Sequence, residues 1–292
     1  GYRFNINMNS VKQSQSMCAR RVFELLASNT VTVSNYSRAV RNLLGDLVIC
    51  TDDGKQLSDL LRLFADEEYY NKFRLLGLRK VLTEHTYTNR LSYIVNTVFG
   101  NKLKMTENRA VILACVNSDE EFTRVYAQYQ RQAYKTTRLI IVSNVGGLET
   151  KNENVEIIDE LTEGVISRIQ RDFDYAFFFS ANDYYGEHYI TDFMLATRYV
   201  DSPVITKDVY FKNYGEVTKV VGGKKYSIVT SYALRRSMIR LADCSIDNLI
   251  EYVNDLDGKC VTYGRVFSID EYNYCENFTG EDCPSVDDLN LV

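Results

Sequence analysis

Hydrophobic and polar positions alternate with two different periods along the chain, and the change of period divides it into elements. Residues 22–28 carry apolar side chains at helical spacing, and residues 30–35 read TVTVSN, an alternation that favours a short strand. A further helix is expected from about Ser37, and LVICTDD at 47–53 predicts a strand followed by a turn. The chain therefore begins with a mixed α/β segment.

Residues 57–99 have apolar positions at helical spacing, which predicts two or three helices. Gly77 and the polar stretch 84–88 are the expected breaks, because glycine and polar clusters interrupt helices. The next segment, GNKLKMTENR at 100–109, is polar and aperiodic. We expect it to link two domains, residues 1–104 and residues 105–292.

From residue 110 onward, continuous apolar runs of strand length alternate with helical patterns. Strands are predicted at 110–117, 138–144, 155–159 and 175–180, with helices at 119–132 and 161–173. Unbroken apolar strands between helices are typical of a parallel sheet covered on both faces. The predicted fold class is therefore α/β, with a Rossmann-like, mostly parallel sheet in the second domain and a largely helical first domain.

The polar residues that follow each apolar run are the candidate binding residues, because ligands of such sheets bind beyond the carboxyl ends of the strands. These residues are Asn117, Asn144, Asp159, Asn182 and Asp183. The remainder of the domain is less regular and predicts β-ribbon and loop, with a helix near 246–253 and an extended piece around 259–274. An irregular half of this kind, beside a Rossmann-like half, commonly binds a second ligand.

The composition, 45% hydrophobic and 25% charged, is that of a folded globular protein. There is no run of 18 apolar residues to span a bilayer and no leader resembling a signal peptide, so we expect a soluble protein. Because the first residue is Gly1 rather than Met, we expect a piece of a longer chain or the remnant of a tag.

Charge and cysteine usage narrow the partners and the compartment. The net charge is −5 with both signs interspersed, so there is no basic stripe and nucleic acid is not an expected partner. The seven cysteines are odd in number and form no CxxC pair, which favours reduced thiols in a cytoplasmic protein. The alternative is a disulfide between Cys275 and Cys283 in an oxidising compartment.

Two other features bear on the chemistry. His85 and His188 are the only histidines, too few for a metal triad or a Ser-His-Asp system. Gly222 and Gly223 lack the strand and helix context of a phosphate-binding loop, so a hairpin turn is the better interpretation. Nearby positive charge could help to hold a diphosphate, or could simply be solvated; it comes from Lys224, Lys225, Arg235 and Arg236.

The first hundred residues carry one family resemblance. NINMNSVKQSQSMCARRVFELLASNTVTVSN at 5–35, with EHTYTNR at 84–90, resembles the closing part of spore-maturation CgeB-like glycosyltransferases of the GT-B fold. The resemblance implies that the glutamate of the Phe-Glu pair, Glu24, faces the donor nucleotide-sugar. It covers only the end of that family's fold, and this segment by itself cannot close a two-domain cleft.

A second resemblance runs from about Arg109 to the end, to GT-A nucleotide-sugar transferases of the large family-2 type. It rests on QRQAYKTTRLIIVSN at 130–144 and on FFFSANDYYGEHYITDFMLA at 177–196. The second phrase stands where relatives carry a run of aspartates before Tyr-Tyr-Gly and a helix. Here that run reads Ser180, Ala181, Asn182 and Asp183, so carboxylates are missing.

The resemblance implies that Asp183 binds Mn²⁺ or Mg²⁺, which would neutralise the diphosphate of a nucleoside-diphosphate sugar. The alternative for Asn182 and Asp183 is a strand-to-helix turn in which Asp183 lies near a helix cap. An inverting transferase also needs a general base. Asp247 in CSIDNLIEYV and Asp270 in FSIDEYNY are the candidates, with a helix cap and a turn aspartate as their alternatives.

These expectations lead to a hexosyltransferase-type enzyme that moves a sugar from a nucleoside diphosphate to a hydroxyl of a saccharide, polymer or protein acceptor. The alternative is a catalytically degenerate glycosyltransferase-fold protein that serves as a nucleotide-sugar binder or scaffold. A third hypothesis is one half of a bifunctional polymer-modifying enzyme, completed by a missing N-terminal part. The sequence is compatible with a monomer and with a homo-oligomer.

Overall fold

The computed structural model describes residues 2–100, 107–254, 259–280 and 283–284. No helix within these ranges is long and apolar enough to cross a membrane. The described residues fall into two compact units, unit 1 with residues 2–100 and unit 2 with the described residues from 107 to 284, and each unit is described by itself. The domain boundary predicted after residue 104 lies in the segment 101–106, outside the described residues.

Unit 1 contains a parallel sheet with the strand order β1-β2-β3 among the described residues. The helix between β1 and β2 is α1 (Arg21–Ala27), and the connection from β2 to β3 contains α2 (Arg38–Leu44) and the short 3₁₀ helix η1 (Gly45–Leu47). The strands are β1 (Phe4–Asn7), β2 (Val31–Ser34) and β3 (Ile49–Cys50). The predicted helix-strand-helix-strand order from residue 22 is confirmed, whereas β1 was not predicted.

Three helices follow β3 within the described part of unit 1: α3 (Gly54–Leu63), α4 (Glu67–Glu84) and α5 (Tyr87–Phe99). The break predicted at 84–88 is confirmed, but Gly77 lies inside α4 and the earlier break falls at 64–66. A Cβ atom at Gly77 would lie 2.9 Å from Leu26 Cδ2. The glycine therefore permits the close packing of α1 on α4 instead of ending the helix.

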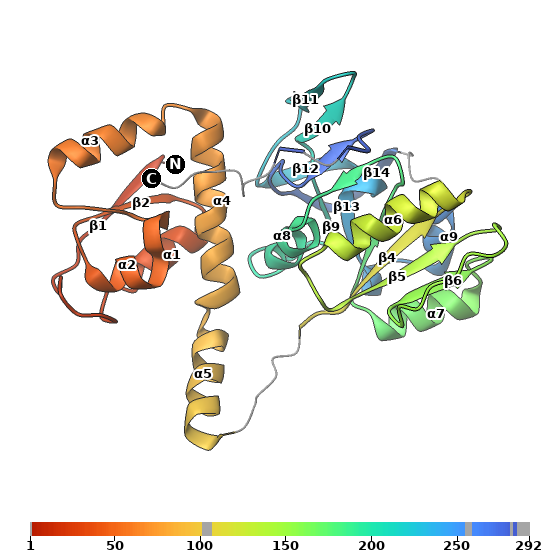
Figure 1. Ribbon diagram of the computed structural model, residues 1–292, viewed down its shortest axis with the longest axis horizontal. Coiled ribbons are helices and arrows are strands. Elements are labelled where there is room, and N and C mark those ends of the chain that lie inside the picture. The colour runs from red at the N-terminus through yellow and green to blue at the C-terminus, as the bar shows by residue number, and fades with distance from the viewer. Residues whose placement is uncertain (1, 101–106, 255–258, 281–282, 285–292) are drawn as a thin grey trace. The chain divides into compact units, whose positions relative to one another are not determined.

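The large sheet of unit 2 has the order β12-β14-β9-β13-β7-β4-β5-β6 among the described residues, and Figure 1 shows β4, β5 and β6 side by side. In this sheet β4, β5, β6 and β7 are mutually parallel, as predicted. Their bounds are β4 (Ala110–Cys115), β5 (Thr137–Val142), β6 (Val155–Ile158) and β7 (Tyr175–Phe178). The predicted helices are present as α6 (Asp119–Arg131) and α7 (Glu163–Asp172).

The second half of unit 2 is more regular than the sequence predicted. Its strands β9 (Val204–Thr206), β12 (Ser227–Ala233), β13 (Ser237–Arg240) and β14 (Lys259–Ser268) complete the large sheet. The strand β13 runs antiparallel between β7 and β9. The expected β-ribbon is present at residues 210–220, where two consecutive strands pair antiparallel. The strands that join the large sheet were not predicted, because they pair with partners distant in sequence, which no local pattern reveals. The helix predicted near 246–253 is α9 (Ile246–Asn254).

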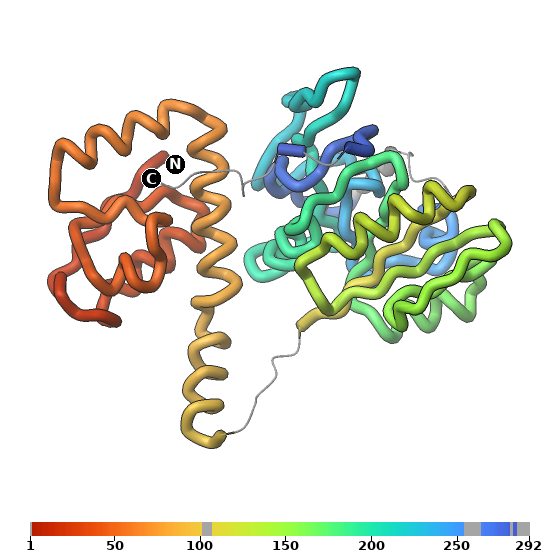
Figure 2. The backbone as a smooth tube through the Cα atoms, viewed as in Figure 1, coloured from red at the N-terminus to blue at the C-terminus, as the bar shows by residue number. Residues whose placement is uncertain are grey.

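A small second sheet has the order β11-β10-β15-β8 among the described residues. Its strands are β8 (Tyr184–Tyr185), β10 (Tyr210–Asn213), β11 (Val217–Val220) and β15 (Tyr274–Glu276). Gly222 and Gly223 lie between β11 of this sheet and β12 of the large sheet, so the hairpin turn predicted there is wrong. In the backbone trace of Figure 2, the cyan segment that contains β10 and β11 forms a hairpin.

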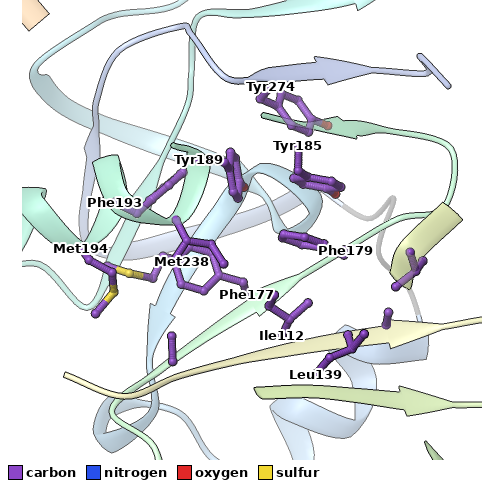
Figure 3. Packing of buried hydrophobic residues seen from close by; sticks show 14 of the residues in the cluster. Ile112, Leu139, Phe177, Phe179, Tyr185, Tyr189, Phe193, Met194, Met238 and Tyr274 are labelled. Atoms are coloured by element: carbon purple, nitrogen blue, oxygen red, sulfur yellow. The ribbon is translucent and has the colours of Figure 1, made fainter. Parts of the chain in front are cut away.

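Side chains of alternate residues in the central strands pack on opposite faces of the large sheet. Ile112, Leu139 and Phe177 pack toward α6 and toward α8 (Tyr189–Ala196), and Figure 3 shows them with Tyr189 and Phe193. On the other face the buried partners of the sheet come from α7 and α9. This two-sided covering confirms the predicted parallel α/β arrangement.

Candidate functional site

The order of the parallel strands reverses at β4. From β4 the chain proceeds through β5 to β6 on one side, whereas β7 lies on the other side of β4. The connection after β4 leads along the sheet to β5, and the connection after β7 leads the opposite way along the sheet to β9. Ligands of open α/β sheets bind beyond the carboxyl ends of the strands at such a reversal. We call the carboxyl ends of β4, β5, β6 and β7, with the residues that follow them, the switch edge.

The structure brings several sequence-predicted residues to the switch edge. The strand ends are in register, since Cys115 lies opposite Val142 and Val142 lies opposite Ile158. The Ser143 hydroxyl donates to the Val116 carbonyl at 2.9 Å, which ties the first two loops together. The exposed polar residues that follow the strands are Asn117, Asn144, Asp159 and Asn182.

Asn117 is held by the helix that follows it. Its backbone N–H and its side-chain amide donate to Glu121 Oε2 at 2.7 and 3.4 Å. Ser118 caps the same helix, α6, by accepting from the Glu121 N–H at 3.2 Å. The loop after β4 is therefore fixed by its own capping residues, with Asn117 exposed at its tip.

Asp183 differs from its neighbour Asn182 because its side chain is fully buried. Oδ1 accepts from the Asn277 N–H at 2.9 Å, and Oδ2 accepts from the Tyr274 hydroxyl at 2.8 Å. The Arg235 Nε atom lies 3.3 Å from Oδ2. Burial raises the pKa of the Asp183 carboxyl to about 6, although the Arg235 charge and both hydrogen bonds act in the opposite direction.

A second carboxylate, that of Glu276, lies close to the Asp183 site. Two arginines and a lysine contact these two carboxylates. The Glu276 carboxylate lies 2.6 Å from Lys212 Nζ, 3.4 Å from Arg236 Nη1 and 3.8 Å from Arg235 Nη1. The contact with Glu276 raises the pKa of Lys212. We call Asp183, Glu276, Lys212, Arg235 and Arg236 the charged cluster.

The charged cluster lies at the β7 end of the switch edge. Arg235 and Arg236 belong to the 3₁₀ helix η2 (Leu234–Arg236), directly before β13. Since β13 is antiparallel to β7 and Met238 pairs with Phe177, the start of β13 lies at the carboxyl end of β7. Both arginine side chains are largely buried, with 9% and 12% exposed, so they are not solvated surface charges.

The Tyr-Tyr-Gly motif organises this region instead of facing solvent. The buried Tyr185 ring stacks on Phe179 with 3.8 Å between centroids, as Figure 3 shows. The Tyr185 hydroxyl accepts from the Ser180 N–H at 3.0 Å and lies 2.9 Å from the Arg235 carbonyl, to which it can donate. One side chain therefore joins the end of β7 to η2.

The rest of the motif holds the segment 273–277. The Gly186 N–H donates to the Asn273 carbonyl at 2.9 Å, and the Asn273 side-chain amide donates to Asp192 Oδ2 at 3.2 Å. A Cβ atom at Gly186 would lie 3.1 Å from Asn273 Cα. The segment also contains Cys275, which is a buried free thiol, as is Cys283.

Replacing Gly186 with alanine is expected to destabilise this packing by about 1–3 kcal/mol, because the added methyl group meets the backbone of Asn273. Amide hydrogen exchange at Asn277, whose N–H is bonded to Asp183, should accelerate. The matched control is Gly164→Ala, where the nearest atom to an added Cβ lies at 3.9 Å. Equal exchange rates at Asn277 in both variants would show that the motif does not hold this segment.

Neither predicted base is an exposed side chain of the switch edge. Asp270 follows the carboxyl end of β14, which runs parallel to β9 and to β7, but its carboxylate faces the interior. Asp270 is buried and pairs with Lys207, whose Nζ lies 2.9 Å from Oδ1, and its carboxylate also accepts from the Tyr272 N–H at 2.9 Å. This carboxylate is already engaged inside the protein, in the turn position that was the alternative interpretation.

Asp247 is exposed in the first turn of α9, at the opposite edge of the sheet. The segment before α9 is held by Leu241, whose N–H donates to the carbonyl of Asp174, the residue before β7. The far end of α9 reaches the carboxyl end of β4, where the Cys115 thiol donates to the Val253 carbonyl at 3.2 Å. The start of α9 therefore faces the amino ends of the parallel strands.

Glu24 lies in unit 1, in the first turn of α1, where it is exposed and pairs with Arg20 at 2.7 Å. The residues just before α1 return to the carboxyl end of β1, because the Ala19 N–H donates to Asn9 Oδ1 at 2.9 Å. Glu24 is thus placed near the end of a parallel strand in its own unit.

The residues at Asp183 do not fit a divalent cation. Its carboxylate oxygens already accept two hydrogen bonds and contact a guanidinium group, and its side chain is sealed from solvent. In the part of the chain that the structure describes, no group of three or more His, Cys, Asp and Glu side chains could hold a metal ion. The metal-ligand role expected for Asp183 would require displacement of Arg235.

The sequence did not identify Lys212, Tyr274, Glu276 or Asn277 as part of the site. These residues lie far along the chain from Asp183, and only the pairing of β10 with β15 and of β15 with β8 brings them together. Glu276 follows directly on the Tyr-Cys pair of β15, and no local pattern distinguishes it from a surface carboxylate.

Comparison with known proteins gives a family match for unit 1. Residues 1–96 match the model of a family described as glycosyl transferase-like. Among solved structures, a crystal structure of S. aureus TarS 1-349 in complex with UDP-GlcNAc matches with 10% sequence identity and a TM-score of 0.39. The match covers 63% of this chain and 61% of that chain, so it spans less than two thirds of the TarS fragment. None of the curated proteins matches.

Proposed function

We propose that this chain is a glycosyltransferase that moves a sugar from a nucleoside-diphosphate sugar to an acceptor hydroxyl, with the donor bound at the switch edge of unit 2. The observation that carries the proposal is the reversal of strand order between β4 and β7, with exposed Asn117 and Asn182 in the two loops that leave there. Nucleotides bind at this position in open α/β sheets.

The arrangement of strands supports a GT-A-like assignment for unit 2. A parallel group β6-β5-β4-β7 is continued by the antiparallel β13 and then by β9, within one sheet. In unit 1, the family match over residues 1–96 and the parallel sheet support the resemblance to the closing part of a CgeB-like GT-B transferase, with Glu24 toward its donor.

The exposed side chains of the switch edge suit the neutral, hydroxyl-rich parts of such a donor. Asn144 and Asn182 each offer an amide that both donates and accepts hydrogen bonds, and Asp159 offers acceptors for hydroxyl groups. We propose that these groups bind the nucleoside and the sugar of the donor. The acceptor is a hydroxyl of a saccharide, a polymer or a protein.

A second candidate function is binding of the same nucleotide-sugar without transfer. It is favoured by the positions of the carboxylates, because Asp183 and Asp270 are engaged in buried ion pairs and Asp247 lies at the opposite edge. An inverting transfer needs a base beside the acceptor hydroxyl. A divalent cation at Asp183 would likewise require that its buried contacts be broken.

The test is a calorimetric titration of the full chain with a panel of nucleoside-diphosphate sugars that includes UDP-GlcNAc. We expect at least one donor to bind, and Asn182→Ala to weaken it about tenfold through lost hydrogen bonds. The matched control is Asn248→Ala, an exposed asparagine beside Asp247 at the opposite edge, which should leave the affinity unchanged.

Mass spectrometry of the same mixtures then separates the two candidates. Slow release of free sugar and nucleoside diphosphate from the bound donor supports transfer chemistry. Binding without any release, with or without added acceptors, supports the second candidate. If no nucleotide-sugar in the panel binds, both proposals are wrong.

A further inference from the structure

The charged cluster has more positive than negative charge. Among its described side chains, Lys212, Arg235 and Arg236 face the carboxylates of Asp183 and Glu276, so three cations meet two anions. The whole chain, by contrast, has a net charge of −5. A local positive excess in an acidic protein attracts an anion to this place.

The cations of the cluster differ in accessibility. Arg235 is the innermost, 9% exposed and in contact with the fully buried Asp183. Lys212 is the most accessible of the three, with 23% of its side chain exposed, whereas Arg236 is 12% exposed and almost as buried as Arg235. Lys212 and Arg236 contact Glu276 and not Asp183, and we call these two residues the outer cations. We therefore expect an anionic ligand to approach at Lys212, which shares the Glu276 carboxylate with Arg236, while the pair of Asp183 and Arg235 stays intact.

Both outer cations lie on aromatic rings. The Arg236 guanidinium is 4.1 Å from the centroid of the Tyr210 ring, and Lys212 Nζ is 5.2 Å from that of the exposed Tyr214 ring. The Arg236 Nε donates to the Lys207 carbonyl at 2.8 Å, which fixes the plane of the guanidinium group. These contacts order the two cations before any ligand binds, and this preorganisation lowers the cost of binding.

The outer cations lie beside the loop that ends β7. Lys212 in β10 pairs with Glu276 in β15, and β15 in turn pairs with β8, whose first residue, Tyr184, follows Asp183. Arg236 directly precedes β13, which is paired with β7. The positive charge therefore lies at the same end of β7 as Asn182, the exposed polar residue that follows this strand.

We propose that Arg236 and Lys212 bind the diphosphate of the donor, and that their fixed charges, with Arg235 behind them, replace a divalent cation. This inference rests on the proposed function, because it concerns the donor of that same site. A guanidinium group matches phosphate oxygens with paired N–H donors, and an ammonium group adds a compact charge. Fixed cations of this kind stabilise the charge on a leaving diphosphate.

The inference also accounts for the environment of Asp183. Its carboxylate is the internal counter-ion that orients Arg235 through a contact of 3.3 Å, and it is not exposed to a metal ion. The missing aspartates in the stretch Ser180 to Asp183 then agree with a site that has no metal to hold. Asn182, at the exposed position of this turn, is a neutral hydrogen-bonding group.

The test uses the full chain and two probes, inorganic pyrophosphate and UDP, each titrated in excess EDTA and again in excess Mn²⁺. We expect both probes to bind in EDTA, with the dissociation constant unchanged within about twofold by Mn²⁺. Lys212→Gln and Arg236→Gln should each weaken binding about tenfold, as loss of a charge-assisted hydrogen bond does. Lys212→Arg should retain most of the affinity.

Matched controls separate this site from general loss of positive charge. Lys219→Gln removes a lysine from β11 of the same small sheet, where Lys219 pairs with Glu271 at 3.3 Å. Arg240→Gln removes an arginine from the other end of β13, where it pairs with Asp201 and Asp243. Both control variants should bind pyrophosphate and UDP like the unchanged chain. If Arg236→Gln does not fold, Lys212→Gln still decides the outcome.

The possible results distinguish this inference from the proposed function. Binding of nucleotide-sugars that requires Mn²⁺ and is lost in Asp183→Asn would overturn the inference and leave the proposed function standing. Binding of pyrophosphate but of no nucleotide would retain the anion site and contradict the proposed function. Failure of both probes to bind, or equal effects in the cluster and control variants, would overturn the inference.

Discussion

Arg235→Gln is expected to destabilise unit 2 by about 3–5 kcal/mol, because it leaves the Asp183 carboxylate buried without its cation. Asp183 is 0% exposed, so water cannot replace the lost guanidinium group. The two hydrogen bonds from Tyr274 and Asn277 remain, but they do not neutralise the charge. The carboxyl would then take up a proton in the folded state more readily than it does beside Arg235.

The measurement is amide hydrogen exchange of Ile112 and Leu113 in β4, which reports the opening of unit 2 within the full chain. The control Arg240→Gln removes a partly exposed arginine and should cost no more than about 1 kcal/mol. In the double variant with Asp183→Asn, part of the stability should return, since no charge is left unpaired. A cost below about 1 kcal/mol for Arg235→Gln would contradict the account of this ion pair.

The second large effect is a dependence of stability on pH that comes from Asp183. Its pKa rises from 3.8 to about 6 on folding, so the folded state keeps this proton when the unfolded state has already lost it. The contribution of Asp183 is most favourable below pH 3.8 and is lost as the pH rises toward 6. The change amounts to about 3 kcal/mol, from 1.36 kcal/mol for each pKa unit.

Asp183→Asn removes this titration while keeping the shape of the side chain. Relative to the unchanged chain, the variant should therefore gain about 2 kcal/mol of stability between pH 4 and pH 7, because a small part of the change has already occurred at pH 4. Exchange of the β4 amides at several pH values measures the difference, with Asp159→Asn, an exposed carboxylate at the same edge, as the control. A constant difference between Asp183→Asn and the unchanged chain across this range would show that the pKa of Asp183 is not raised.

The sequence pattern predicted the parallel core of unit 2 because its strands are continuous apolar runs between helices. The strands around Ile112, Leu139 and Phe177 need no knowledge of their partners to be recognised, since each is buried on both faces. By contrast, β13 and β14 were not recognised as parts of the large sheet. Their place is decided by pairing with strands that are distant along the chain, such as the pairing of β14 with β9.

At the site, the sequence predicted which loops carry polar residues but not which side chains face outward. Asn182 and Asp183 are adjacent, yet one is exposed and the other is sealed. The difference comes from Arg235 and from Asn277, which lies 94 positions away from Asp183 in the chain. Contacts over such separations leave no local periodic signal, so Asp183 was expected to face a ligand.

Contacts with distant parts of the chain also explain why the roles of Gly77 and Asp270 were not predicted. A glycine inside a helical pattern predicts a break, but the close approach of Leu26 from another helix uses that glycine without interrupting α4. Asp270 was a candidate base by its chain context, whereas Lys207, 63 positions earlier, neutralises it inside the fold. In both cases the partner that decides the role comes from elsewhere in the tertiary structure.

The most direct test of the central claim, donor binding at the switch edge, is hydrogen exchange of the full chain with and without a bound nucleoside-diphosphate sugar. The account predicts slower exchange after β4, β5, β6 and β7, in the segments 116–118, 143–145, 159–160 and 179–183. Protection confined to unit 1, or to residues 243–248 at the opposite edge, would contradict it.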